Sequence, residues 1–133
     1  MMSCMLRALG VEFAVDDFIA GSSLFPCAHR LYRKGESMFP VTQPNGPMDQ
    51  HSGINIKVSA AQRNQLAAQI EDAIAYLENN QEELKRLCNF PGVEVVGLDF
   101  GVKLPDEFES MYFMPKLLYL AGSIGIGIEI TYY

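Results

Sequence analysis

Alternation of apolar and polar residues along the chain predicts several β-strands. Ile54, Ile56 and Val58 alternate with polar residues, which is the period-two pattern of a strand with one buried face. The run from Val93 to Val102 alternates in the same way from Val96 onward. Less complete alternation predicts further strands over residues 1–11, 29–34 and 111–113. A strong last strand is predicted over residues 124–132, where Ile124, Ile126, Ile128, Ile130 and Tyr132 share a face.

A helical pattern fills the stretch between the two clearest strands, from Ser59 to Cys88. Ser59 with Gln62, and Asn80 with Glu83, have the spacing of capping boxes that begin helices. One straight helix over this range would be about 44 Å long, whereas a domain of this size is only roughly 36 Å across. We therefore expect a break at the two consecutive asparagines and a second short helix beyond them. The apolar stripe that faces the core comprises Leu66, Ile70, Ala73, Ile74, Leu77, Leu84 and Leu87.

Turn-forming residues separate the remaining elements. Two aspartates before Phe18, with Gly21 as a stop, predict one short helix, and Pro115 followed by Gly122 predicts another. Prolines, glycines and polar residues crowd the stretch from Ser37 to Gly53, where they oppose both helix and strand pairing. We expect a flexible Pro/Gly-rich loop over residues 37–53.

The interleaving of these elements predicts a single α+β domain over residues 1–133. We expect four or five strands in a mainly antiparallel sheet, with one long broken helix and short helices packed on it, and a ferredoxin-like arrangement is one candidate. Hydrophobic residues make up 49% of the chain and charged residues 20%, a composition that excludes wholesale disorder.

Charge and cysteine usage narrow the function classes. The net charge is -6, and residues 71–133 alone hold four Lys/Arg against eleven Asp/Glu, which argues against nucleic-acid binding. The longest uncharged apolar run, Leu117–Ile128, is too short for a bilayer that needs about 20 residues, so no membrane association is expected. Three cysteines without a C-x-x-C pair indicate reduced thiols in a cytoplasmic protein.

One basic cluster offers a candidate ligand site. His29, Arg30, Arg33 and Lys34 would hold a phosphate, a carboxylate or an acidic partner surface, with His51 nearby at the end of the loop. The plainer alternative, which we favour, is a solvated edge strand whose cations discourage aggregation.

Metal binding and covalent catalysis have weaker support. Cys27, His29, Asp49 and His51 are the only clustering of metal-capable residues, and their spacing is not a zinc signature. A Cys/His hydrolase would need Cys27 or Cys88 as a thiolate beside an oriented histidine, for which no local pattern exists. We therefore predict no catalytic residue, no metal and no cofactor.

Several short motifs resemble a family of small uncharacterised bacterial domains. They are Leu24-Phe25-Pro26 leading to Lys34-Gly35-Glu36, then Ser52-Gly53 before a long helix, and Tyr112 to Leu118 before a terminal strand. The resemblance implies the strand–helix–strand core expected above, and it implies no established activity.

Two function hypotheses follow. The first is a non-enzymatic intracellular protein-binding module, which binds a partner or a second copy of itself through its acidic helical face or a free sheet edge. Toxin-neutralising immunity proteins include such small acidic α+β proteins, which this chain loosely resembles. The alternative is a small-molecule-binding protein or enzyme that uses the 37–53 loop as a lid over the basic cluster at 29–34, with His51 for proton transfer.

Overall fold

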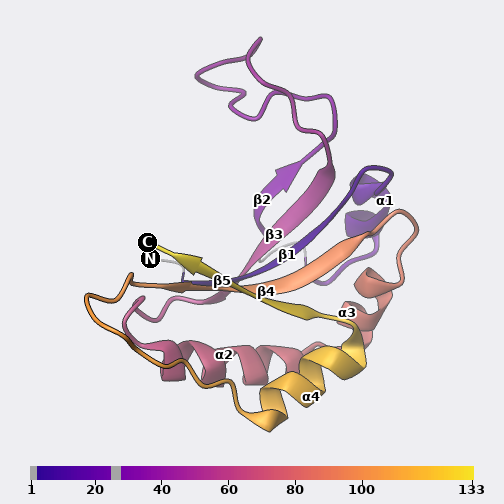
Figure 1. The fold of residues 1–133 in the computed structure, drawn as a ribbon. Coiled ribbons are helices and arrows are strands. Elements are labelled where there is room, and N and C mark those ends of the chain that lie inside the picture. Colours follow the sequence, from indigo (N-terminus) through magenta and orange to yellow (C-terminus); the bar gives the residue numbers. More distant parts are fainter. Residues whose placement is uncertain (1–2, 25–27) are drawn as a thin grey trace.

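A computed structural model describes residues 3–24 and 28–133, and within them the chain is an α+β protein, as predicted (Figure 1). Strands and helices alternate along the chain and form one sheet with a helical layer. The elements are β1 (Cys4–Gly10), α1 (Val15–Ala20), β2 (Ala28–Tyr32), β3 (Ser52–Ser59), α2 (Leu66–Asn79), α3 (Gln81–Cys88), β4 (Val95–Val102), α4 (Pro115–Ile124) and β5 (Gly127–Tyr132).

The sheet has five strands in the order β2-β3-β1-β4-β5. β1 pairs antiparallel with β3 and β4, β2 pairs antiparallel with β3, and β5 alone runs parallel to its neighbour, β4. The expectation of a mainly antiparallel sheet is thus confirmed. From β1 to β4 the chain follows the β-α-β-β-α-β order of ferredoxin-like folds, to which α4 and β5 are added at one edge.

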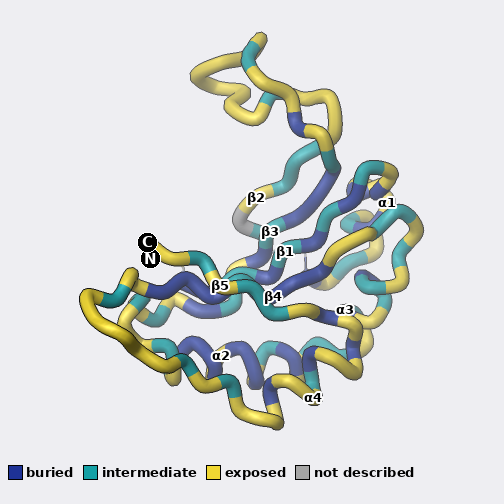
Figure 2. Tube along the Cα trace, viewed as in Figure 1, coloured by how far each residue is buried: buried dark blue, intermediate teal, exposed yellow. Residues whose placement is uncertain are grey.

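The hydrophobic core lies between one face of the sheet and the helices beneath it (Figure 2). Alternate residues of the strands point into it, because successive side chains in a strand point to opposite faces. The predicted stripe of α2 and α3 lies in the same core, since all its members are buried or partly buried there. Side chains with no exposed surface include Leu6, Ile54, Ile56, Leu98 and Phe100 from the strands and Leu77, Leu84, Leu87 and Leu117 from the helices.

The predicted start of the long helix is wrong. Ser59 is the last residue of β3, and α2 begins seven residues later, at Leu66, with no side-chain cap. The Ser59 hydroxyl is used elsewhere, since it donates to Asp72 at 2.6 Å and accepts the Ala61 N–H at 3.1 Å. The intervening turn is held from α2, where the buried Gln69 amide donates to the carbonyls of Gln62 and Gly101.

The break itself falls at Asn80, where it was expected. Asn80 does not cap the second helix, because its amide donates back to the Tyr76 carbonyl at 2.9 Å. The single long helix is not confirmed, since α2 and α3 are separate helices of 14 and 8 residues.

The region of α4 and β5 also departs from expectation. α4 continues past Gly122 to Ile124 and ends at Gly125, whose φ of 108° is left-handed and therefore suits glycine. Ile124 consequently belongs to the helix rather than to the last strand. Met111, Tyr112 and Phe113 form no strand and lead into α4 as irregular chain.

Residues 33–51, which we call the arm, extend β2 and β3 away from the body of the molecule (Figure 1). Backbone hydrogen bonds cross the arm, from the Met38 N–H to the Pro47 carbonyl and from the Asp49 N–H to the Glu36 carbonyl, both at 2.8 Å. The predicted loop of residues 37–53 thus includes the start of β3, and its flexibility stays a prediction.

Candidate functional site

The predicted basic cluster lies on β2 and the base of the arm, and each of its cations has a carboxylate nearby. Arg33 makes a bidentate hydrogen bond to Asp16 at 2.6 and 2.8 Å. Arg30 lies 3.6 Å from an oxygen of Asp49, and Lys34 lies 3.9 Å from one of Glu12, a looser contact. These cations are thus at least partly neutralised within the protein, and their role in binding a ligand stays a prediction.

The other predicted site residues are only partly described. Cys27 and the side chain of His29 lie outside the described part of the chain, while His51 is half-buried just before β3. Nowhere in residues 3–24 and 28–133 do three His, Cys, Asp or Glu side chains gather as metal ligands would. In Figure 1 the arm projects away from the helices and does not fold back over the sheet as a lid.

Both described cysteines are poor nucleophiles. Burial raises the pKa of Cys4 far above its usual range, and nearby Asp99 and Asp72 raise it further. Burial also raises the pKa of Cys88 to about 11. Because the thiolate is the reactive form, both groups stay protonated and unreactive at neutral pH.

Among the residues that the structure describes, no strand pairs with the outer edge of β5. The Tyr133 N–H donates to the Val102 carbonyl and its own carbonyl accepts from the Leu104 N–H, both at 2.9 Å, so the backbone of Tyr133 faces β4. Backbone groups alternate sides along a strand, which directs those of Glu129 and Thr131 to β4 as well. The N–H and C=O groups of Ile128, Ile130 and Tyr132 therefore point outward, where no strand among the described residues pairs with them.

The side chains of β5 do little to block this edge. Ile130 and Tyr132 are 38% and 50% exposed. The one charged residue, Glu129, lies on the opposite face and accepts a hydrogen bond from Arg7 at 3.3 Å. Arg7 also lies 3.7 Å from Asp99, which in turn accepts from the Thr131 hydroxyl at 2.7 Å. The only charge on the strand is thus already paired.

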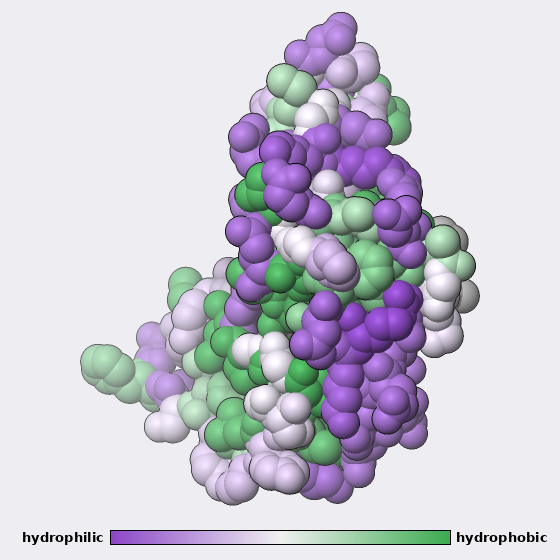
Figure 3. Space-filling model, turned by 90° about the vertical axis from the view of Figure 1, so that its right-hand side faces the viewer, coloured by the Kyte–Doolittle hydropathy of each residue, from purple (hydrophilic) through white to green (hydrophobic). Residues whose placement is uncertain are grey.

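The stretch of chain that forms α4 and β5 has no net charge and is rich in apolar side chains. Residues 110–133 hold one Lys and one Glu, a balance of zero in a chain of net charge -6. Figure 3 shows hydrophobic residues gathered on one side of the body and hydrophilic residues on the other. We call the surface formed by residues 110–133 the β5–α4 side. Its exposed large hydrophobic side chains are Tyr112, Met114, Leu118, Tyr119, Ile130, Tyr132 and Tyr133.

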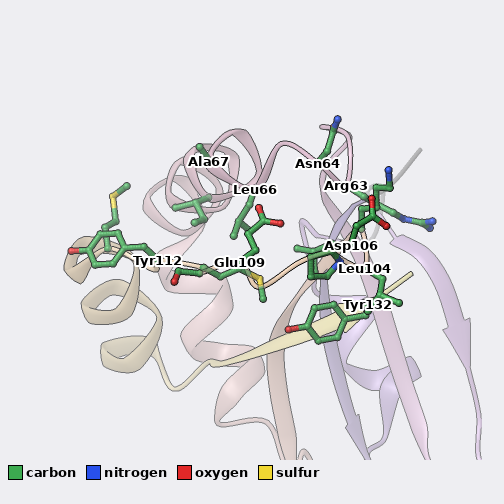
Figure 4. A pocket seen from close by; sticks show the side chains of 16 residues that line it. Arg63, Asn64, Leu66, Ala67, Leu104, Asp106, Glu109, Tyr112 and Tyr132 are labelled. Atoms are coloured by element: carbon green, nitrogen blue, oxygen red, sulfur yellow. The ribbon is translucent and has the colours of Figure 1, made fainter.

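A cleft of about 520 Å³ adjoins the same edge, between the start of α2 and the loop that joins β4 to α4 (Figure 4). Leu66 of α2 and Tyr132 of β5 lie on opposite walls. Polar groups from Arg63, Asp106 and Glu109 stand around an apolar lining, which is the usual composition of a ligand pocket. The Arg63 guanidinium stacks 3.5 Å from the centre of the Tyr133 ring.

Sequence reasoning missed this cleft. Its walls come from parts of the chain about 40 residues apart, which are joined where the Lys103 N–H donates to the Arg63 carbonyl at 3.2 Å. The one available signal was the set of large apolar residues within the otherwise polar loop, Leu104, Phe108 and Tyr112, all of them exposed.

Comparison of the chain with protein-family models found no match, and comparisons with curated proteins and with solved structures found none either. The resemblance to a bacterial domain family therefore stays a prediction. Within the described residues, no helix is both long enough and apolar enough to pass through a bilayer.

Proposed function

We propose that this protein is a protein-binding module without catalytic activity of its own, and that it binds its partner through the free edge of β5. The observation that carries the proposal is the row of outward backbone groups at Ile128, Ile130 and Tyr132, beside a neutral surface rich in exposed apolar side chains. An extended segment that adds to such an edge gains main-chain hydrogen bonds along its whole length.

Two further features support this proposal over catalysis. The described thiols are protonated at neutral pH because burial raises the pKa of each. The cations of β2 lie beside carboxylates of the protein itself rather than in an open anion site. Catalysis would not explain why the β5–α4 side exposes so many apolar side chains. Partner binding would, since contiguous apolar patches on a protein surface mark interaction sites.

Retention on immobilised protein tests the proposal. Wild type is compared with Ile130→Lys, which places a charge at the free edge, and with Val41→Lys, a matched control at the tip of the arm, where Val41 is 93% exposed. A partner that is retained by wild type and by the control but lost on Ile130→Lys supports the proposal. If wild type retains no protein, a second copy of itself included, the proposal is wrong.

The cleft favours a second candidate function, the binding of a small molecule. Its volume lies within the range of about 300–1,000 Å³ that is usual for ligand pockets. A ligand at 100 times its dissociation constant would stabilise the protein by about 2.7 kcal/mol in a thermal melt. Ala67→Trp would fill the cleft and abolish this stabilisation by the ligand. Ala75→Trp, on an exposed part of α2 outside the cleft, would leave it unchanged.

A further inference from the structure

We infer that the partner at the β5 edge is a second copy of this chain, paired antiparallel with β5 across a twofold axis that passes through Ile130. The inference rests on the proposed function, because it names the partner for the same edge. The two sheets would then join into one continuous sheet, with the helices of both copies on the same side. Four observations, on backbone register, side chains, charge and the opposite edge, lead to this arrangement.

The first observation is the direction of the backbone groups. Residues that face each other in a hydrogen-bonded antiparallel pair must both point toward the partner strand. A twofold axis at Ile130 places Ile130 opposite the partner's Ile130, and Ile128 opposite the partner's Tyr132. The backbone N–H and C=O groups of all three residues point outward from the sheet edge. Every free N–H and C=O of the strand is therefore satisfied, about six hydrogen bonds in total.

The second observation is the pairing of side chains. On the helix side of the sheet the same register brings only Ile128, Ile130 and Tyr132 opposite one another. Ile130 and Tyr132 are exposed in the single chain and would be covered in the pair. On the other side, Glu129 comes opposite the partner's Thr131. Shifting the axis to Glu129 would oppose two carboxylates, which is destabilising. Shifting it to Thr131 would place Glu129 opposite the aromatic ring of the partner's Tyr133 instead of opposite the Thr131 hydroxyl, so the register at Ile130 is the one that the strand favours.

The third observation is the distribution of charge. A protein of net charge -6 associates with itself most easily through a neutral surface, because the remaining surface repels a second copy. The β5–α4 side is such a surface, since Glu129 is paired with Arg7 and Lys116 of α4 lies 3.6 Å from Glu78. The acidic loop around Asp106 adjoins the far end of β5, so the loops of the two copies project in opposite directions beyond the paired strands.

The fourth observation is the contrast with the opposite edge. β2 has a register shift between Ala28 and Arg30, and Arg30 and Arg33 stand on or next to the strand. Irregular pairing and cations both hinder the addition of another strand. β5 pairs with β4 over six residues without interruption. α4 adds exposed Leu118 and Tyr119 to the same side, which extends the apolar area available to a second copy.

Charge exchange at the twofold axis tests the inference. Because residue 130 would face its own counterpart, Ile130→Lys opposes two cations and Ile130→Glu opposes two carboxylates, so each variant should dimerise about tenfold or more weakly than wild type. An equimolar mixture should restore the dimer as a Lys/Glu heterodimer. The masses are measured by light scattering or sedimentation between micromolar and sub-millimolar protein, with Val41→Lys and Val41→Glu as matched controls that stay dimeric.

An uncharged variant keeps the test decisive should a charged one fold poorly. Ile130→Cys would place two thiols on facing residues of a hydrogen-bonded pair, about 5.5 Å apart between Cα atoms, which a disulfide spans. Mild oxidation should link this variant into dimers through residue 130, as mapped by mass spectrometry, whereas Val41→Cys should stay unlinked. No link through residue 130, or no recovery on mixing folded charged variants, would overturn the register.

The oligomeric state of wild type, together with the retention experiment, distinguishes a failure of this inference from a failure of the proposed function. A wild type that stays monomeric at every concentration shows that the second copy is not the partner. The proposed function still stands in that case if a different protein is retained in a way that Ile130→Lys abolishes. A wild type that is monomeric and retains nothing contradicts both.

Discussion

The two edges of the sheet differ in how far each is closed to further pairing. β2 is five residues long, shifts register against β3 and has cations on and beside it, each near a carboxylate. β5 is regular, has one charge that Arg7 already pairs, and exposes Ile130 and Tyr132. Exposed edges are usually blocked by irregular pairing and by charged side chains, and β5 has fewer of these features than β2, so β5 is the edge at which to expect a partner.

The two edges also differ in how their side chains rest on the open face of the sheet. Tyr32 of β2 lies over Gly53, where an added methyl group would stand 2.4 Å from the phenol ring and 2.6 Å from the Ala8 carbonyl oxygen. Glu129 of β5 lies over Gly97, where the nearest atom would be a carboxylate oxygen at 2.6 Å. The first contact includes a backbone carbonyl, whereas the second involves only a side chain.

Proline substitution is expected to give the largest effect and to test which groups of β5 face outward. Thr131→Pro should cost about 3 kcal/mol or more of unfolding free energy, because it removes both the hydrogen bond from the Thr131 N–H to β4 and the hydroxyl bond to Asp99, and leaves their acceptors unpaired. Ile130→Pro should cost much less, since the N–H of Ile130 faces solvent in one copy. Urea unfolding at low protein concentration measures both variants, and equal losses would show that the assignment of outward groups is wrong.

Alanine at the two glycines should sharpen the contrast in side-chain packing. Gly53→Ala should lower the free energy of unfolding by about 1–3 kcal/mol, because the Ala8 carbonyl is backbone of the paired strand β1 and cannot swing aside as a side chain can. Gly97→Ala should change it by less than about 1 kcal/mol, since Glu129 swings aside and alanine restricts the unfolded chain. Denaturant titration compares the two. A larger loss at Gly97 would contradict the proposed difference between the edges.

The parts of the fold that depend on local pattern could be predicted from the sequence. Ile54 and Ile56 are fully buried as their alternation requires, and Leu77 and Leu84 lie in the core as members of a helical stripe. Each of these inferences needed only the period of a strand or of a helix.

The errors arose where a residue had two possible local roles. Ser59 has the spacing of a cap, yet its hydroxyl bonds to Asp72, thirteen residues away. Gly122 and Gly125 are both plausible helix ends, and only the positive φ of Gly125 distinguishes them. Spacing alone does not contain either fact, because each depends on what the folded chain brings nearby.

The candidate site depended on long-range pairing, which the sequence does not encode in any short pattern. A strongly alternating run near Ile128 and Ile130 predicts a strand, but it does not predict that the strand lies parallel to β4 at an edge. The basic run near Arg33 was recognised as a candidate site, while its carboxylate partner Asp16 lies in a different element. Strand order and ion pairing are both tertiary facts.

Removal of Arg7 should make the two edges more alike. Arg7→Met leaves Glu129 unpaired on β5, so the edge gains the free charge that usually hinders pairing. We expect a loss of stability of about 1 kcal/mol at most, because these groups are partly exposed, together with weaker self-association. Adding Glu129→Gln to Arg7→Met should recover the association, as measured by sedimentation. If the double variant associates no better than Arg7→Met alone, the free charge is not the cause.

The smallest effect is expected at the β2 edge, from the pair of Asp16 and Arg33. The hydrogen bond from Arg33 lowers the pKa of Asp16, so the pair stabilises the fold above the ordinary pKa of an aspartate and this contribution is lost as pH falls through the lowered value. Asp16→Asn should therefore cost a few tenths of a kcal/mol at pH 7, since solvent screens both groups, and nothing at about pH 2. Asp17→Asn, on the same helix and without a cation partner among the described residues, is the control. Urea titrations give the free energy of unfolding of wild type and the two variants at both pH values. Asp16→Asn should be less stable than the other two at neutral pH alone. A difference that persists in acid would assign the effect to packing rather than to the ion pair.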